Sequence, residues 1–284
     1  MNTRSIFKHA LLAATAAVAV QTASAQNVWL TEPGTLVVTP SYTSQSYDTF
    51  YAGTAAMALP ADITQRTTAL RFDYGFAPGL ALDASFGHTE VRFAPPGASF
   101  KRGGFDDTRL GLTYTLLQES AETPAITFRL GAIIAGDYDV PTSVPPINPG
   151  DGASGFEASI AVGKSLGEGF ALYGELGYRN RNHGVPDDIF ASVGLSKSFG
   201  GLAVNAGYRR TGAQGGGDIG GPGFGTDFGF PGVKEITQFA EGGLSYTDRG
   251  GRSYQFVVAR KVGTVRNTGD TTVYGFSISL PFRF

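Results

Sequence analysis

Apolar residues alternate with small or polar residues through much of this chain, and the alternation is most regular at its carboxyl end. One face of that last segment carries Tyr274, Phe276, Ile278, Leu280, Phe282 and Phe284. Successive side chains of a β-strand point to opposite faces, so these residues share one side of a strand. Aromatic residues at both ends with aliphatic residues between them are typical of a strand that crosses a membrane in a barrel. We also expect this terminal strand to be the signal that the outer-membrane assembly machinery recognises.

Twelve segments carry this alternation and are predicted as strands. They are Gly34–Ser46, Thr64–Phe76, Leu80–Phe93, Phe105–Leu117, Ala125–Tyr138, Gly155–Ser165, Phe170–Asn182, Asp188–Phe199, Leu202–Arg210, Glu235–Tyr246, Arg252–Val265 and Thr271–Phe284. In the eleventh segment Arg260 follows apolar residues on the outward face, and either a bulge or a side chain that reaches the membrane surface would accommodate it.

The links between these segments alternate in length, which is a second and independent signal. Short turns are predicted at residues 77–79, 119–124, 167–169, 200–201 and 247–251, and longer loops at 47–63, 94–104, 140–154, 183–187, 211–234 and 266–270. Outer-membrane barrels combine short periplasmic turns with longer extracellular loops, and an even strand number places both termini in the periplasm. The sequence therefore predicts an all-β fold, a single antiparallel up-and-down transmembrane barrel of about 12 strands. A secreted soluble β protein is the alternative fold.

The amino terminus has the pattern of a secretory signal peptide. Arg4 and Lys8 precede an apolar run from Ala10 to Val20, and a small-x-small site ends at Ala25. The run is too short to span a bilayer, so we expect cleavage near Ala25. The predicted domains are a signal peptide at 1–25 and an outer-membrane barrel at 26–284, and the predicted location is the bacterial outer membrane.

Composition narrows the function classes. The chain has no cysteine, so disulfides do not hold it together, and its net charge of −2 gives no basic field for nucleic acid. Charged residues make up 16% of the chain, against about 25% in soluble proteins. The mean hydropathy is −0.03, as expected when apolar and polar faces alternate in a barrel.

Charged residues collect on the predicted inward faces of the strands. The candidate pore-lining residues are Arg71, Asp73, Asp83, Arg109, Arg129, Glu157, Glu175, Arg179, Arg181, Arg209, Glu241 and Lys261. Ionised groups in a narrow lumen need partners or water. A barrel of this size can hold either a narrow pore or a plug of ion pairs, and the sequence leaves both open.

The loop Thr211–Lys234 is a second candidate for function. It holds ten glycines between Gly212 and Gly232, with Phe224, Phe228 and Phe230 among them. A loop of this length is uncommon unless it has a function or lacks order. It could fold into the lumen as a gate whose phenylalanines contact an apolar solute, or it could be a mobile surface loop.

Signals for catalysis are weak. His88 lies on the predicted lipid face, where barrel lipases carry a Ser/His pair, but no spacing indicates a partner. His183 lies in a loop, and Asp137, Asp139, Asp187 and Asp188 are most simply solvated turn carboxylates. We therefore predict no catalytic residue, no metal site and no cofactor, and we classify the protein as a non-enzyme.

The order of several motifs resembles that of a known barrel family. They are Glu32-Pro33-Gly34, Asp73-Tyr74-Gly75, the octapeptide DTRLGLTY at 107–114, the decapeptide GAIIAGDYDV at 131–140, GKSLG at 163–167 and GELGYR at 174–179. The chain is similar in these motifs to the family called "putative MetA-pathway of phenol degradation", whose members are often described as transporters. The resemblance implies an outer-membrane barrel and solute passage rather than catalysis.

Together these signals predict a barrel that lets a small apolar or aromatic solute cross passively. A closed barrel with a structural or surface-interaction role, and a barrel hydrolase acting on lipid, are the alternatives. The expected partners are outer-membrane lipid, the barrel-assembly machinery and a small-molecule solute, with no nucleic acid.

Overall fold

The computed structural model describes residues 28–138 and 147–284, so the predicted signal peptide lies outside the described residues. The strands are β1 (Thr35–Ala52), β2 (Ala55–Ala77), β3 (Leu80–Phe93), β4 (Phe100–Phe105), β5 (Thr108–Leu117), β6 (Ala125–Ile134), β7 (Gly155–Gly167), β8 (Phe170–Arg181), β9 (Asp188–Phe199), β10 (Leu202–Ala213), β11 (Ile236–Thr247), β12 (Ser253–Lys261) and β13 (Thr272–Arg283). In these residues there is no helix with the length and apolarity that a membrane crossing requires.

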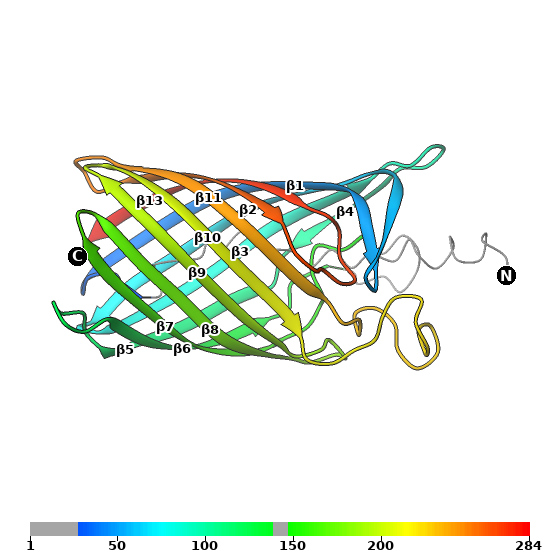
Figure 1. The fold of residues 1–284 in the computed structure, drawn as a ribbon, viewed down its shortest axis with the longest axis horizontal. Coiled ribbons are helices and arrows are strands. Elements are labelled where there is room, and N and C mark those ends of the chain that lie inside the picture. The colour runs from blue at the N-terminus through cyan, green and yellow to red at the C-terminus, as the bar shows by residue number, and fades with distance from the viewer. Residues whose placement is uncertain (1–27, 139–146) are drawn as a thin grey trace.

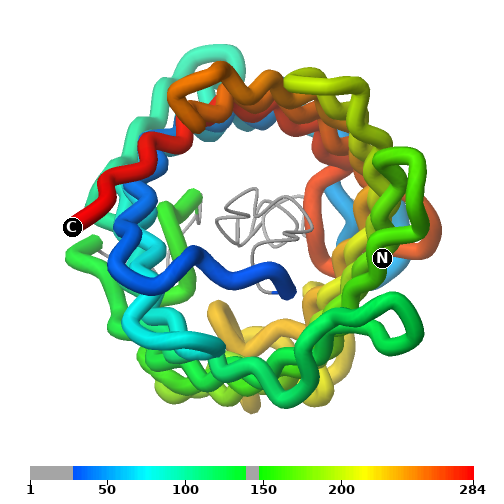
Figure 2. Tube along the Cα trace, turned by 90° about the vertical axis from the view of Figure 1, so that its left-hand side faces the viewer, coloured from blue at the N-terminus to red at the C-terminus, as the bar shows by residue number. Residues whose placement is uncertain are grey.

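The strands form one antiparallel sheet that closes on itself (Figures 1 and 2). Apart from β4 and β5, each strand pairs with its neighbours in sequence, and β13 pairs with β1 to close the ring. The strands β4 and β5 both pair with β3, at its two halves, and therefore share one position in the wall. The described chain thus forms a twelve-position barrel, which confirms the predicted fold and rules out a two-layer soluble sandwich.

Closure gives every strand except β4 two neighbours, so the backbone groups of the barrel body are paired with one another and need no water. Both ends of the described chain and the short turns lie at one end of the barrel, which we call the turn end. The longer connections lie at the other end, which we call the loop end.

Several predicted boundaries are wrong. The expected loop at 47–63 is a β-hairpin, because β1 and β2 continue past the barrel body to a turn at Gly53 and Thr54. Gly53 has φ of 57°, a conformation that glycine adopts without strain. The expected loop at 94–104 contains β4, the fifth predicted strand stops at Ile134 and the eleventh stops at Lys261.

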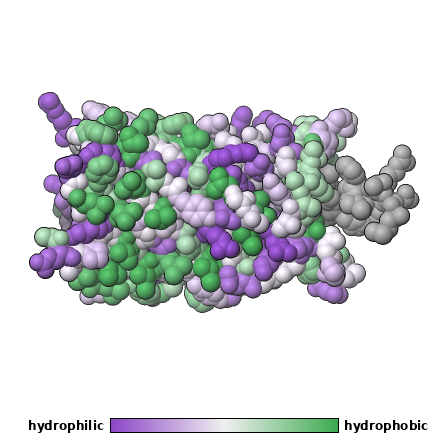
Figure 3. Space-filling model, in the orientation of Figure 1, coloured by the Kyte–Doolittle hydropathy of each residue, from purple (hydrophilic) through white to green (hydrophobic). Residues whose placement is uncertain are grey.

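An apolar belt lies over the half of the barrel nearer the turn end, on the face that Figure 3 shows, and its exposed residues come from β3 and from β5 to β13. Its exposed residues include Leu82, Phe86, Leu110, Leu112, Tyr114, Leu130, Ile160, Leu172, Leu176, Val193, Leu195, Val204, Leu244, Phe256, Tyr274 and Phe276. Large exposed apolar surfaces of this extent mark contact with another apolar medium, here lipid.

Arg260 on β12 needs no bulge, because its pairing with β11 and β13 is regular. Its guanidinium forms an ion pair with Asp270 at 2.8 Å.

Polarity reverses along β3 without any change of register. Its outward residues are Leu80, Leu82, Ala84 and Phe86, then His88, Glu90 and Arg92. Its inward residues are Ala81, Asp83, Ser85, Gly87 and Thr89, then Val91 and Phe93. The β2 strand changes in the same way, with Arg66 outward and Ile63 inward near the loop end. The body of the barrel is therefore apolar outside and polar inside, whereas its loop-end extension is polar outside and apolar inside.

Candidate functional site in the barrel lumen

A chamber of about 340 Å³ occupies the lumen. Strands β1, β2, β12 and β13 give it a wall of small polar groups, which includes Thr39, Ser41, Thr43, Gln255, Ser277 and Ser279. Strands β5 to β9 give it a charged wall. A volume of this order lies within the range of sites that hold small molecules.

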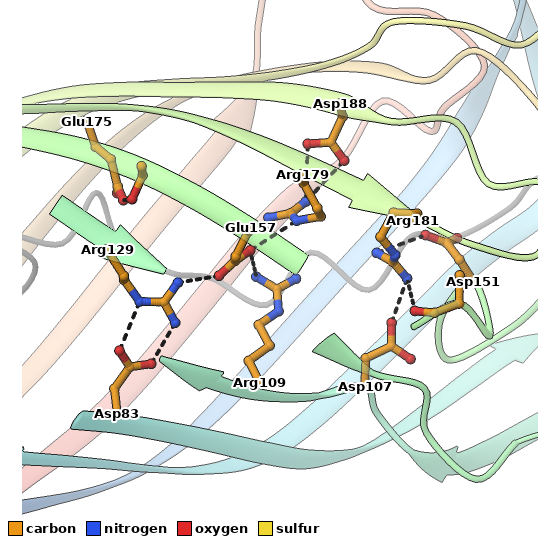
Figure 4. A network of polar contacts seen from close by, with 12 residues as sticks. Asp83, Asp107, Arg109, Arg129, Asp151, Glu157, Glu175, Arg179, Arg181 and Asp188 are labelled. Atoms are coloured by element: carbon orange, nitrogen blue, oxygen red, sulfur yellow. Dashed lines mark hydrogen bonds and ion pairs between the residues drawn. The ribbon is translucent and has the colours of Figure 1, made fainter. Parts of the chain in front are cut away.

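Glu157 on β7 is the centre of the charged wall (Figure 4). Its carboxylate accepts hydrogen bonds from Arg129 at 2.5 Å and from Arg179 at 3.1 Å, and Arg109 lies 3.9 Å away. Arg129 also donates two hydrogen bonds to Asp83, at 2.9 and 2.7 Å. Glu157 is 4% exposed, so these guanidinium groups replace the water that an ionised carboxylate needs.

A neighbouring group surrounds Arg181 on β8. Its guanidinium donates to Asp107 at 2.8 Å and to the carbonyl oxygen of Ala153 at 2.9 Å, with Asp151 3.8 Å away. Asp107 also accepts hydrogen bonds from the Tyr138 hydroxyl at 2.6 Å and from the backbone of Gly136 at 3.1 Å. Arg179 completes the wall by pairing with Asp188 at 3.2 Å.

Glycine makes room for this network. A Cβ atom at Gly111 on β5 would lie 2.3 Å from Arg129 Nη2 and from Asp83 Oδ1. Gly111 faces inward between Arg109 and Thr113, so the Arg129–Asp83 pair lies directly over its backbone. The inward glycines of the pattern therefore determine where the long charged side chains can lie.

The predicted pore-lining residues fall into two groups. Those on the chamber surface are Arg71, Arg109, Arg129, Glu157, Glu175, Arg179, Arg181 and Arg209. Asp73, Asp83, Glu241 and Lys261 lie behind that surface, as partners or neighbours of other charges. Asp73 pairs with Arg71 at 2.6 Å, and Glu241 pairs with Arg209 at 3.3 Å.

Sequence reasoning missed Asp107, Asp151 and Asp188 as members of this site. Asp188 was detectable, because it shares the inward parity of β9 with Phe190 and Ser192. Asp107 was detectable as well, because the predicted strand Phe105–Leu117 contains it and gives it the inward parity of Arg109. Asp151 lies in an irregular segment, where alternation carries no information about side-chain direction.

An ordered cap covers the loop end of the chamber. It consists of residues 214–235, between β10 and β11, and its Pro231 and Val233 face the chamber. Its apolar side chains join the inward residues of the loop-end extension in one buried cluster, which contains Tyr47, Phe50, Ile63, Val91, Phe93, Ile147, Ile219 and Val233. The predicted gate residues Phe224, Phe228 and Phe230 pack against this cluster, with ring centroids 5.6–5.7 Å apart, and do not line the chamber.

Polar contacts fix the cap to neighbouring loops. The buried Asn267 accepts hydrogen bonds from the backbone of Gly53 at 2.7 Å and of Ile219 at 3.1 Å, and it donates to the carbonyl oxygen of Lys234 at 2.8 Å. Arg266 forms a two-point pair with Asp218 at 2.5 and 2.6 Å. That hydrogen-bonded pair lowers the pKa of the Asp218 carboxyl.

Two loop carboxyls at the chamber have raised pKa values because they are buried. Burial raises the pKa of Asp151, and Arg181 opposes that shift. Burial also raises the pKa of Glu235, to about 7, against the attraction of Lys261. We call the loop-end wall of the chamber its ceiling. The ceiling therefore contains carboxyl groups whose charged form is disfavoured by burial.

At the turn end, residues 28–34 cross the mouth of the barrel (Figure 2). We call this segment the strap. Val28 and Trp29 pack against Ala125, Ala161 and Tyr173 on the opposite wall. The Trp29 ring nitrogen donates to Glu119 at 2.8 Å.

Gly163 provides the seat for the strap. A Cβ atom at this position would lie 2.5 Å from Val28 Cγ1 and 3.0 Å from the Trp29 ring. The wall is therefore shaped to the strap at this point, and a side chain there would displace it.

A disulfide between Val28→Cys and Gly163→Cys should form on oxidation and reduce solute passage through the barrel. The chain has no other cysteine, and a sulfur in the place of Val28 Cγ1 would lie about 2.5 Å from the Cβ position of Gly163, within reach of the bond. Liposome swelling before and after reduction measures the effect, with Val28→Cys alone as the control. Equal passage with and without the disulfide would show that solutes pass the strap without moving it.

His88 faces outward at the loop-end edge of the belt. Its ring packs edge-to-face with Phe105, with the ring centroids 5.7 Å apart. Within residues 28–138 and 147–284, no hydrogen bond joins His88 to a serine, a threonine or a carboxylate, and no three ligands could hold a metal ion together. His183 is an exposed loop residue beside Asn182. Asp187 accepts hydrogen bonds from Asn180 and Tyr178 at the edge of β9.

The comparisons with known proteins agree with this geometry. Residues 64–247 match the model of the family described as "Putative MetA-pathway of phenol degradation". The chain belongs to this family. The sequence resembles none of the curated proteins closely enough to count as a relative.

The fold of the chain is similar to those of solved outer-membrane barrels. An outer membrane channel from Pseudomonas putida F1 is 14% identical, with a TM-score of 0.73 over 91% of this chain and 99% of the channel. The translocator domain of the autotransporter NalP from Neisseria meningitidis is 11% identical, with a TM-score of 0.52 over 90% of each chain. At these identities the likeness shows the fold, that of an outer-membrane barrel.

Proposed function

We propose that this protein is a passive channel of the bacterial outer membrane for small solutes. The observation that carries the proposal is the polar chamber inside the apolar belt. A barrel that only anchors or supports has no need of a lumen of about 340 Å³ at the level of the membrane. The family and its fold support a channel rather than an enzyme.

In this proposal the turn end faces the periplasm and the loop end faces outward, since short turns and both chain ends are periplasmic in such barrels. The predicted signal peptide would be removed near Ala25, and the face that ends in Phe282 and Phe284 would be read during assembly. The charged wall would then act as the electrostatic filter and the cap as the outer gate.

Solute passage tests the proposal directly. Proteoliposomes that contain the folded barrel should swell in an isotonic solution of a small neutral sugar such as arabinose, and protein-free liposomes should not. Larger sugars should be excluded, because the chamber has room for small solutes only. A folded barrel that admits no sugar of any size and conducts no ions in a planar bilayer would contradict the proposal.

A closed barrel with a structural or surface-interaction role is the second candidate. It is favoured by the buried apolar cluster under the cap and by the strap, which obstruct the two ends of the lumen. The two candidates differ in the same experiment, since a barrel closed by its cap and strap keeps arabinose out as long as both are intact, whereas a channel admits it.

A further inference from the structure

Arg109 differs from the other arginines of the charged wall. Arg129, Arg179 and Arg181 each donate at least two hydrogen bonds to carboxylate or carbonyl oxygens. Among the described residues Arg109 donates none, and its closest carboxylate oxygen, on Glu157, is 3.9 Å away. Glu157 cannot turn to it without loss, because its oxygens already accept from Arg129 and Arg179.

The guanidinium of Arg109 is accessible from the chamber. It lines the chamber from β5, and Figure 4 shows it directed from below toward Glu157 and Arg179. Its side chain is 18% exposed, so most of its surroundings are protein rather than water. A guanidinium carries five N–H donors in a planar fork that fits a carboxylate, and a partly dehydrated one gains most from such a partner.

Three carboxylates of the same wall already have cationic partners. Asp83 accepts two hydrogen bonds from Arg129, Asp188 pairs with Arg179, and Asp107 accepts from Arg181, Tyr138 and Gly136. A positively charged solute would compete with these arginines. A negatively charged solute would supply Arg109 with the acceptor that it lacks.

Apolar surface adjoins the arginines. The Phe190 ring on β9 lies under the guanidinium of Arg179, 5.1 Å from its centroid, and faces the chamber. A Cβ atom at Gly177 would lie 2.1 Å from Phe190 Cζ, so the far end of the ring covers the backbone of this glycine. Val185, Pro186 and Pro231 continue this surface at the ceiling.

We propose that the chamber binds a small monocarboxylate with a compact apolar body, whose carboxylate pairs with Arg109 and whose body lies against Phe190 and the ceiling. This inference rests on the proposed function, since the solute must enter the chamber from the membrane surface. It adds to that function a charge preference and a binding residue.

Benzoate and benzamide are suitable probes, because they share a shape and differ in charge. Calorimetric titration of the detergent-solubilised full chain should show benzoate binding and much weaker benzamide binding. Arg109→Gln should weaken benzoate binding roughly tenfold or more, the effect of one charge-assisted pair, and leave benzamide unchanged. Arg109→Lys should retain part of the affinity, and Arg249→Gln, at an exposed turn residue, should match the unaltered protein.

Three results would overturn the proposal. The barrel could bind benzoate and benzamide equally, it could bind neither probe, or Arg109→Gln could leave benzoate binding unchanged. Gel mobility of unheated samples verifies that each variant is folded. Arabinose passage of the unaltered barrel tests the proposed function separately, because binding in detergent does not require conduction. A barrel that passes arabinose and ignores benzoate refutes this inference alone.

Discussion

Removal of the cap should raise the single-channel conductance of this barrel several-fold. A variant in which a short glycine–serine linker replaces residues 215–232 loses Ile219 and the phenylalanines that pack over the lumen. Without these side chains, nothing covers the loop end of the chamber in the variant. Planar-bilayer recording measures the change, and larger sugars should also enter proteoliposomes.

Apolar contacts hold the cap more firmly than its ion pair does. Ile219 is 4% exposed, and burying one such side chain contributes about 1.5–3 kcal/mol. The side chains of Asp218 and Arg266 are 30% and 34% exposed, and an exposed pair contributes about 0–1 kcal/mol. Ile219→Asp should therefore open the channel, whereas Asp218→Asn, one residue away, should leave it nearly unchanged.

A deletion elsewhere at the loop end provides a matched control. Residues 96–98 form the exposed tip of the β3–β4 hairpin and do not line the chamber. Shortening this tip should not alter conductance. Equal conductance of the cap deletion and the tip deletion would mean that the cap is not the barrier.

Glu157→Gln should destabilise the barrel more than any exchange of a surface carboxylate. The variant removes the negative charge that lies between the guanidinium groups of Arg109, Arg129 and Arg179. Breaking a buried ion pair by removing one partner costs about 3–5 kcal/mol, because the other charge stays buried without compensation. The same variant should make the pore more selective for anions, since the chamber gains a net positive charge.

Glu90→Gln is the control for this variant, since Glu90 also has two basic partners. Arg92 and Lys101 contact it at 2.6 and 2.5 Å, but their side chains are 54% and 58% exposed. Its loss should cost less than about 1 kcal/mol. Urea unfolding midpoints of both variants in lipid vesicles test the contrast, and similar midpoints would show that the lumen network is hydrated like a surface pair.

The sequence contains enough information for the barrel, because alternation and loop lengths depend on local geometry. The strand Phe170–Asn182, for example, differs from β8 by one residue. The β1–β2 extension was missed because its polarity is reversed. Where Ile63 and Met57 face inward and Arg66 faces outward, the rule that apolar residues face lipid gives the wrong result.

The charged site was predicted only in part for a different reason. Alternation indicates which strand residues face the lumen, and on that basis Arg109 and Glu157 were identified. It says nothing of Asp151, which lies outside the predicted strands, or of the cap, whose position depends on contacts between residues far apart in the chain. Ile219, for instance, packs with Phe50 and Val91, which precede it by more than a hundred residues.

The polarity reversal of β2 and β3 also fixes the depth at which the barrel is immersed. Outward displacement would expose Phe72 and Phe86 to water, and inward displacement would bury Arg66, Glu90 and Arg92 in acyl chains. Both displacements cost free energy, so the protein is held in register with the bilayer from two sides. The overhanging part of the β1–β2 hairpin then projects on the order of 30 Å beyond the hydrocarbon at the loop end.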